Sequence, residues 1–332
     1  MTTYVNGMTP LEAISQIIQE TLVSLRYADT PLLSIVAQDA RTTRQKNIRW
    51  NVNTSTDFTG AIRLASADAN SATSDNIENA NLSIGQYAFT RTVSLDPDEI
   101  EQAAVAGIGE LRNLVNQHFK TKLIQIRLEL NSVLYNGTGN AASAGIKGLD
   151  VVAAQSGDYA GIDGTGNAWK GGFVLENGGT NRSLTKDLLY SADDAMFNQG
   201  TGSAKVIVTT KEIITNYKKL FDDERAQYTP NNVAGNVDLA HSSASWNGIP
   251  MVADRACPVG QMYFLDTDYL SLYTYDYTDR SGLVTMPANG MVFTMADLPE
   301  NNMYAKRFEV GTKAQLQVED RRAVGVIKDI TQ

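Results

Sequence analysis

Side chains capable of chemistry are few in this 332-residue chain, and they are widely separated. Cys257 is the only cysteine, and His118 and His241 are the only histidines. Zinc sites and hydrolytic triads are built from clustered Cys, His and acidic residues. A single cysteine also rules out an intrachain disulfide. We therefore expect no catalytic residues, no metal and no cofactor.

Two stretches come near to a ligand site without completing one. Asp68, Asn70 and Asp75 partly match the pattern of an EF-hand calcium loop. The match fails because Thr73 occupies the glycine position and Asn79 the closing glutamate position. The glycines between 137 and 182 fit neither a phosphate loop nor a dinucleotide-binding motif. Their spacing favours turns.

Asp266 and Asp268 follow a predicted strand, where α/β proteins often place functional carboxylates. They support an alternative of a different class, a ligand-binding or enzyme domain over residues 183–273. No base, nucleophile or phosphate loop accompanies them in the sequence. A turn or cap role is therefore the favoured interpretation, and we expect the protein not to be an enzyme.

The charge balance limits the possible partners. The chain has 28 Lys and Arg against 37 Asp and Glu, a net charge of −9. Broad nucleic-acid-binding faces need clustered cations, so at most a small local patch could meet DNA. No apolar run approaches the ~20 residues of a membrane span, and the N-terminus lacks the pattern of a secretion signal. We expect no membrane partner.

The dominant element is a predicted helix from Asp96 to Asn136. Asp96, Pro97 and Glu99 form a capping box with proline at the first helical position, and Gly137 supplies the stop. About 40 residues would span about 60 Å. A long core helix, one arm of a coiled coil and the spine of a broad, flat subunit all remain open. One face carries the apolar residues Ile100, Ala104, Ile108, Leu111, Val115, Phe119, Leu123, Ile126, Leu130 and Leu134.

Residues 1–46 are predicted to form an arm. A helical stripe begins near Thr9, Asp29-Thr30-Pro31 breaks it, and a short apolar patch follows at 32–36. Arg41, Arg44 and Lys46 then make a basic cluster, for which a solvated linker is favoured over an interfacial arm.

Residues 46–95 are predicted to form a protruding hairpin. Ile48, Trp50 and Val52 alternate with polar residues, and a polar tip runs from Thr54 to Asn81. A lone hairpin is marginal in water, so we expect it to lean on another chain. A flexible loop over the protein's own body is the alternative. The returning strand is predicted to carry Leu82, Ile84, Tyr87, Phe89, Val93 and Leu95.

From Ser183 the pattern becomes α/β. Ser183 is expected to cap a helix, Val206–Val208 to form a buried strand, and Thr210 to cap the next helix. Asn247-Gly248 predicts a tight turn. A long half-exposed strand from Phe308 to Val318 is expected to pack against the long helix.

This order of elements resembles the major capsid protein of tailed bacteriophages, the Hong Kong 97-like capsid fold shared with encapsulins. The resemblance is clearest in two segments, Asn-Gly-Ile-Pro-Met-Val at 247–252 and Gln-Met-Tyr-Phe-Leu-Asp at 261–266. The resemblance implies an α+β fold with an N-terminal arm (1–46) and an extended β-hairpin loop (47–95). It further implies a peripheral domain with a spine helix and return strands (96–139 and 301–332), and an axial α/β domain (140–300).

The resemblance also implies a function. The chain would self-assemble into hexamers and pentamers that close an icosahedral head shell around the double-stranded DNA of a tailed phage. It would do so in the bacterial host cytoplasm, with portal and cement proteins as possible partners. The arm is too short for a scaffold domain, so a scaffold would be separate or already removed. No lysine lies between Lys46 and Lys120, so we expect no covalent crosslink from the loop. An encapsulin-type shell is the alternative.

Aromatic residues and arginine are enriched at interface hot spots. On that basis the sequence predicts a set of intersubunit contacts in and beside the hairpin. Local packing within the hairpin is an equal alternative for each of them. The predicted contact residues are Trp50, Phe58, Tyr87, Phe89, Arg49, Arg63 and Arg91.

Overall fold

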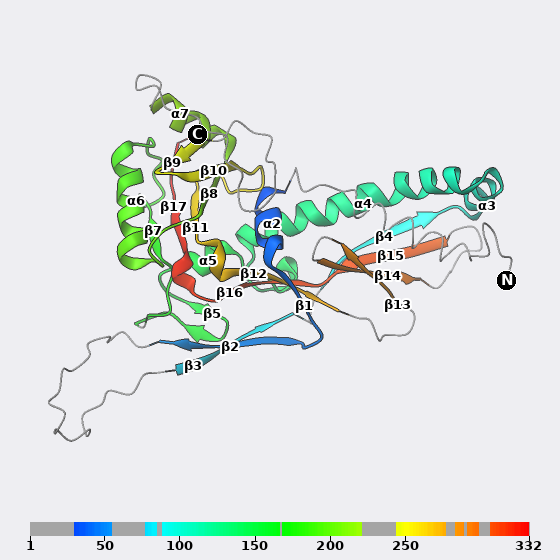
Figure 1. The fold of residues 1–332 in the computed structure, drawn as a ribbon, viewed down its shortest axis with the longest axis horizontal. Helices are drawn as coiled ribbons and strands as arrows, with labels where there is room; N and C mark the ends of the chain where they lie inside the picture. Colours follow the sequence, from blue (N-terminus) through cyan, green and yellow to red (C-terminus); the bar gives the residue numbers. More distant parts are fainter. Residues whose placement is uncertain are drawn as a thin grey trace.

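The structure, a computed structural model, describes residues 30–54, 77–84, 88–166, 168–220, 244–276, 283–288, 291–298 and 306–331. The molecule is elongated, with an α/β end and a half along which one long helix runs (Figure 1). Within the described ranges, no helix is long and apolar enough to cross a membrane. Predicted arm helix 9–25 and hairpin tip 55–76 lie outside these ranges.

A six-stranded sheet organises the α/β end. The sheet is mixed, with two parallel and three antiparallel strand pairs, and every strand has three to five residues. In spatial order the strands are β7 (Phe173–Leu175), β17 (Val324–Ile327), β11 (Met262–Leu265), β8 (Val206–Thr209), β10 (Ile249–Ala253) and β9 (Ala244–Trp246).

Each face of this sheet belongs to a different core. Ile207 and Phe264 face helices α6 (Lys186–Gln199) and α7 (Lys211–Leu220) in the smaller core. Val208 is the neighbour of Ile207 in β8 and Tyr263 the neighbour of Phe264 in β11, and both face the main core. Because successive side chains of a strand point to opposite faces, strands buried on both faces are apolar throughout, as in Val206–Val208. The predicted strand is confirmed.

The predicted cap of α6 is wrong by two residues. Thr185, rather than Ser183, precedes the helix, and its Oγ1 accepts a hydrogen bond from the Leu188 N–H at 3.2 Å. The cap must accept from the residue two or three positions on. Asn247-Gly248, with φ of +47° and +83°, forms the predicted tight turn between β9 and β10.

The long predicted helix is two helices, α3 (Pro97–Ala106) and α4 (Ile108–Asn136). Between them, Gly107 has φ +117° and ψ 173°, which only glycine adopts readily. Because the apolar spacing continues across this position, periodicity alone does not reveal the break. The predicted ends are confirmed at Pro97 and Asn136, and α4 spans about 44 Å.

A four-stranded antiparallel sheet lies beside α4, with β4 in contact with the helix. Leu123, Ile126 and Leu130 of α4 are fully buried, as predicted. The strands, in order, are β13 (Leu283–Ala288), β14 (Met291–Asp297), β15 (Lys306–Thr312) and β4 (Phe89–Leu95).

A three-stranded sheet connects the two ends: β1 (Ala40–Thr43), β12 (Leu270–Tyr275) and β16 (Ala314–Val318). β1 pairs in parallel with β12, so Arg41 lies in a strand and not in a linker. Arg44 and Lys46 lie exposed in the bend that follows, as the solvated-linker interpretation predicts. The predicted strand 308–318 is divided at Lys313 into β15 and β16, which belong to different sheets. β16 runs inside the molecule and is buried on both faces. Its alternating polar residues predicted a strand with one exposed face, and that prediction is wrong.

The hairpin contains β2 (Asn47–Asn53) and β3 (Ile77–Ser83), an antiparallel pair. Ile77–Asn81, predicted to be part of the polar tip, belong to the strand. The returning strand is also divided, because β4 joins the other sheet. The remaining elements are α2 (Pro31–Val36), α5 (Leu149–Ala153), β5 (Asp158–Tyr159), β6 (Ile162–Asp163) and 3-10 turns η1 (Ala37–Asp39), η2 (Ala141–Ser143), η4 (Thr267–Tyr269) and η5 (Arg321–Ala323).

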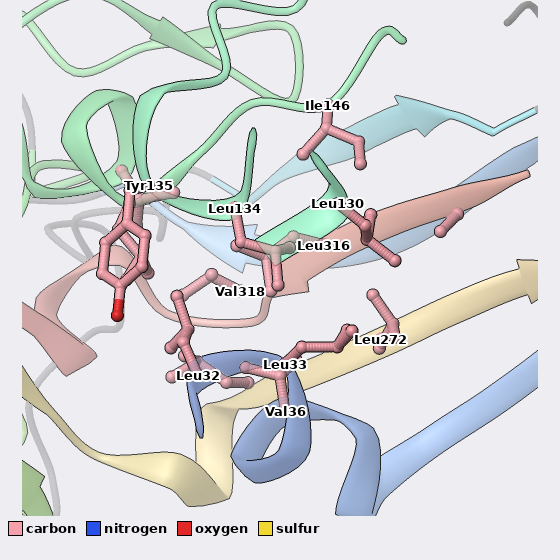
Figure 2. Packing of buried hydrophobic residues seen from close by; sticks show 14 of the residues in the cluster. Leu32, Leu33, Val36, Leu130, Leu134, Tyr135, Ile146, Leu272, Leu316 and Val318 are labelled. Carbon is pink, nitrogen blue, oxygen red and sulfur yellow. The ribbon is translucent and has the colours of Figure 1, made fainter. Parts of the chain in front are cut away.

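The main core lies where these parts converge. Figure 2 shows Leu32, Leu33 and Val36 of α2 against side chains from three other elements. The apolar patch predicted at 32–36 is thus part of the core, with Leu32 and Leu33 fully buried. Opposite it lie Leu130 and Leu134 of α4, Leu272 of β12, and Leu316 and Val318 of β16.

Candidate assembly surfaces

The β2–β3 ribbon has one face against its own subunit. Its apolar residues Ile48, Val52, Ala80 and Leu82 are buried in the main core. Trp50 Nε1 donates to the Glu319 carbonyl oxygen at 3.1 Å. The support that a lone hairpin lacks therefore comes, for this stem, from the same chain.

The other face of the ribbon is exposed and rich in asparagine. Arg49 and Asn51 lie across from Asn81 and Asn79, and Asn79 Nδ2 donates to Asn51 Oδ1 at 3.3 Å. Asparagine is depleted in strands, so this face is poorly explained by the fold alone. Each carboxamide both donates and accepts. Apart from Arg49, the exposed residues of this face are uncharged, which gives a neutral hydrogen-bonding surface.

The predicted contact residues fall into three groups. Trp50 and Phe89 pack inside their own subunit: Trp50 is half-buried with its ring centroid 6.4 Å from that of Trp169, and Phe89 is 4% exposed. Arg49 is exposed, and Arg91 forms an ion pair with Glu129 of α4. These two arginines lie in different sheets. Phe58, Arg63 and Tyr87 lie outside the described residues.

A buried polar junction fixes α2 to α4. Asp254, 1% exposed, accepts from the Leu32 N–H at 3.1 Å, Tyr135 Oη at 2.9 Å and Asn131 Nδ2 at 3.0 Å. Asn131 Oδ1 accepts from the Leu33 N–H at 2.9 Å. The free N–H groups at the start of α2 are thereby satisfied from other elements. Burial, reinforced by Asp254, raises the pKa of Tyr135 well above its usual value and keeps it a hydrogen donor.

Arg321 makes a second junction that the sequence did not indicate. It is fully buried, and its guanidinium donates to carbonyl oxygens of α5, of the loop after α5, and of Trp169 beyond β6. Carbonyls at a helix C-terminus favour a cation, while burial itself lowers the pKa of Arg321. Five hydrogen bonds of 2.8–3.1 Å join it to Val151, Val152, Ala154, Gly157 and Trp169.

The outer side of α6 is unusually apolar for an exposed helix surface. Tyr190 is 54% exposed and Phe197 is 74% exposed. Asp187 and Asp194 are exposed as well, and spacings of three, four and three residues place all four on one side of the helix. We name this set, Asp187, Tyr190, Asp194 and Phe197, the α6 stripe. These four residues are not among the contacts predicted from the sequence.

The acidic and thiol candidates have structural surroundings. Asp266 caps η4, accepting from the Asp268 N–H, and also accepts from Thr201 Oγ1 at 2.8 Å. Asp268 forms an ion pair with Lys205. The favoured cap role of Asp266 is confirmed. Cys257 is 4% exposed, and burial raises the pKa of its thiol. Over the described residues, no three or more His, Cys, Asp or Glu gather in a way that could hold a metal ion.

Comparison with known proteins gives the same fold over nearly the whole chain. The model of the SU10 major capsid protein family matches residues 2–331. The capsid protein in the asymmetric unit of cyanophage A-1(L) is 26% identical, with a TM-score of 0.77, over 92% of this chain and 94% of that one. No curated protein matches the sequence.

More distant structures share the fold alone. The capsid of a native GTA particle is 12% identical with a TM-score of 0.61, over 92% of each chain. The SrpI encapsulin of Synechococcus elongatus is 14% identical with a TM-score of 0.56, over 93% of this chain and 92% of that one. The predicted α+β capsid fold is confirmed. A major capsid protein builds a head shell from copies of itself, and the chain belongs to the SU10 major capsid protein family.

Proposed function

We propose that the chain closes an icosahedral head as hexamers and pentamers around the double-stranded DNA of a tailed phage, without enzymatic activity. The observation that carries the proposal is the family match over residues 2–331. The similarity to the cyanophage capsid over more than nine-tenths of both chains supports it. Separate scaffold, portal and cement proteins, and assembly in the host cytoplasm, belong to the same proposal.

The proposal also assigns a role to each part of the chain. An arm (1–46) and an extended loop (47–95) would reach neighbouring subunits. A peripheral domain (96–139 and 301–332) and an axial domain (140–300) would form the shell itself. The elongated half along α4 and the separate six-stranded sheet are consistent with the last two.

The exposed face of the ribbon is suited to such reaching contacts. A stem anchored to its own subunit holds the carboxamide face and Arg49 in one orientation, so little conformational entropy is lost on binding. Copies of a chain with net charge −9 repel one another. A neutral face with one cation lets them approach at lower electrostatic cost. Arg49, Arg91, Phe58, Arg63 and Tyr87 remain the proposed contacts.

Trp50 and Phe89 contribute indirectly in this scheme. Their burial in the subunit means that they hold the stem and β4 in place. Removing either would then disturb the shell through the fold of the subunit, and would be seen first as a loss of subunit stability.

Electron microscopy of the purified chain, with light scattering, tests the proposal. Closed shells, or hexamers and pentamers that close when scaffold is supplied, are the expected outcome. Shells that co-purify with nucleic acid favour the phage head, whereas shells loaded with a single cargo protein favour the encapsulin alternative. A monomer or dimer under all conditions would contradict the proposal.

A further inference from the structure

The α6 stripe has the composition of an interface. Two aromatic residues project from one side of a 14-residue helix, and Phe197 is 74% exposed. Aromatic residues dominate interface hot spots. Tyr190 is held in place by an edge-to-face contact with Trp246, at 4.8 Å between ring centroids. A held aromatic ring loses little entropy on binding.

The stripe is also acidic, which indicates the charge of its partner. Asp187 and Asp194 are seven residues apart, which corresponds to about 10.5 Å along a helix. A matching pair of cations occurs on the same molecule. Lys211 and Lys219 of α7 are exposed and eight residues apart, or about 12 Å. Around the helix axis Lys219 is about 80° from Lys211. Glu212, also exposed, is about 100° from Lys211 and lies about 10.5 Å along the axis from Lys219.

The positions of the two helices would allow α6 of one copy to contact α7 of another copy. Both cover the same face of the six-stranded sheet, packing in one core. In Figure 1, viewed down the shortest axis, α6 lies at the left edge of the α/β end and α7 at its upper edge. Both therefore lie at the outline of the molecule in this view, where neighbours in a shell would lie. A closed ring needs two different, complementary surfaces on each subunit.

We propose that the α6 stripe of one copy docks against the α7 lysines Lys211 and Lys219 of the next copy, as the contact that closes a capsomer ring. This rests on the proposed function. The aromatic rings supply buried apolar area, and the two Asp–Lys pairs fix the register and the direction around the ring. Other occupants of the stripe, such as a cement protein, are outcomes of the test.

The test reverses the charges and then restores the match. D187K/D194K should raise the protein concentration needed for half-maximal assembly by at least about tenfold. K211D/K219D should do the same. Combining the four substitutions should return assembly to near the wild-type concentration. F197S should weaken assembly without any change of charge.

A matched control separates specific contact from net charge. E110K/E176K changes net charge by the same amount at two other exposed positions and should leave assembly unchanged. Melting temperatures of the unassembled variants should stay within about 3 °C of wild type, because surface substitutions cost little.

The outcomes are distinct. An equal defect in the control, or no rescue by the fourfold variant, would overturn the inference while wild-type shells still form. Normal capsomers that fail to recruit a cement protein would assign the stripe to that partner and also overturn it. A wild-type chain that forms neither capsomers nor shells would overturn the proposed function as well.

Discussion

Asp254 joins three parts of the chain through one carboxylate, which makes it a sensitive residue for subunit stability. D254A would leave the Leu32 N–H, Asn131 and Tyr135 without their acceptor. An unsatisfied buried donor costs about 1–3 kcal/mol, so we expect a loss of at least about 3 kcal/mol in the free energy of unfolding. Urea titration of the unassembled subunit measures it.

D254N is the matched control, because it retains one carbonyl oxygen. It should lose less than D254A, about 1–2 kcal/mol. Equal losses from the two variants would show that the hydrogen bonds to the carboxylate are not what stabilises the junction.

The buried thiol gives a second residue-scale prediction. Burial raises the pKa of Cys257, and only the thiolate reacts with alkylating or disulfide reagents. At pH 8 the native protein should react with a thiol reagent at least about 100-fold more slowly than the urea-unfolded chain. Because the native pKa is raised, the native rate should still be rising with pH above pH 9. Rapid labelling of native protein would contradict the buried position.

At the scale of elements, Gly107 decides where the long helix breaks. A Cβ at this position would meet nothing within 4 Å, but φ is +117°. The cost of G107A is therefore confined to the backbone, and we expect a loss of about 1–2 kcal/mol by urea titration. G202A is a matched variant, since Gly202 has φ +113° and equally open space in a loop. A gain in helix content and stability for G107A alone would mean that α3 and α4 fuse.

Elements whose signals are local were predictable from the sequence. The capped start at Pro97, the turn at Asn247-Gly248 and the apolar strand at 206–208 each depend on neighbouring residues only. The errors concern partners distant in sequence. β1 is a strand because it pairs with β12, and β15 and β16 are separate strands because they pair in different sheets.

The candidate surfaces were harder to predict than the fold. Hot-spot composition selected Trp50 and Phe89, but the same aromatic character suits a core. Phe89 is buried in the main core, and Trp50 packs half-buried against it. Exposure, not composition, distinguishes the α6 stripe, and exposure depends on the whole fold. Asp254 and Arg321 have no local signal, because their partners are mostly more than 100 residues away.

At the scale of the whole molecule, the hairpin tip tests the proposed extended loop. Replacing residues 55–76 by a short Gly-Ser turn leaves the paired stem of β2 and β3 intact. We expect a folded subunit with an unchanged melting temperature and strongly reduced shell formation, measured by light scattering and electron microscopy. Normal shells from this variant would show that the tip makes no bracing contact.

The junction at Asp254 also bears on the time course of synthesis. The Leu32 N–H donates its hydrogen bond to a residue 222 positions later in the chain. At ribosomal rates of about 5–20 residues per second, roughly 10–45 s separate the two during translation. α2 therefore cannot dock in its final place on the nascent chain until most of the subunit has been made. α2 stays undocked over that interval, and chaperones or neighbouring nascent copies have this window in which to meet it.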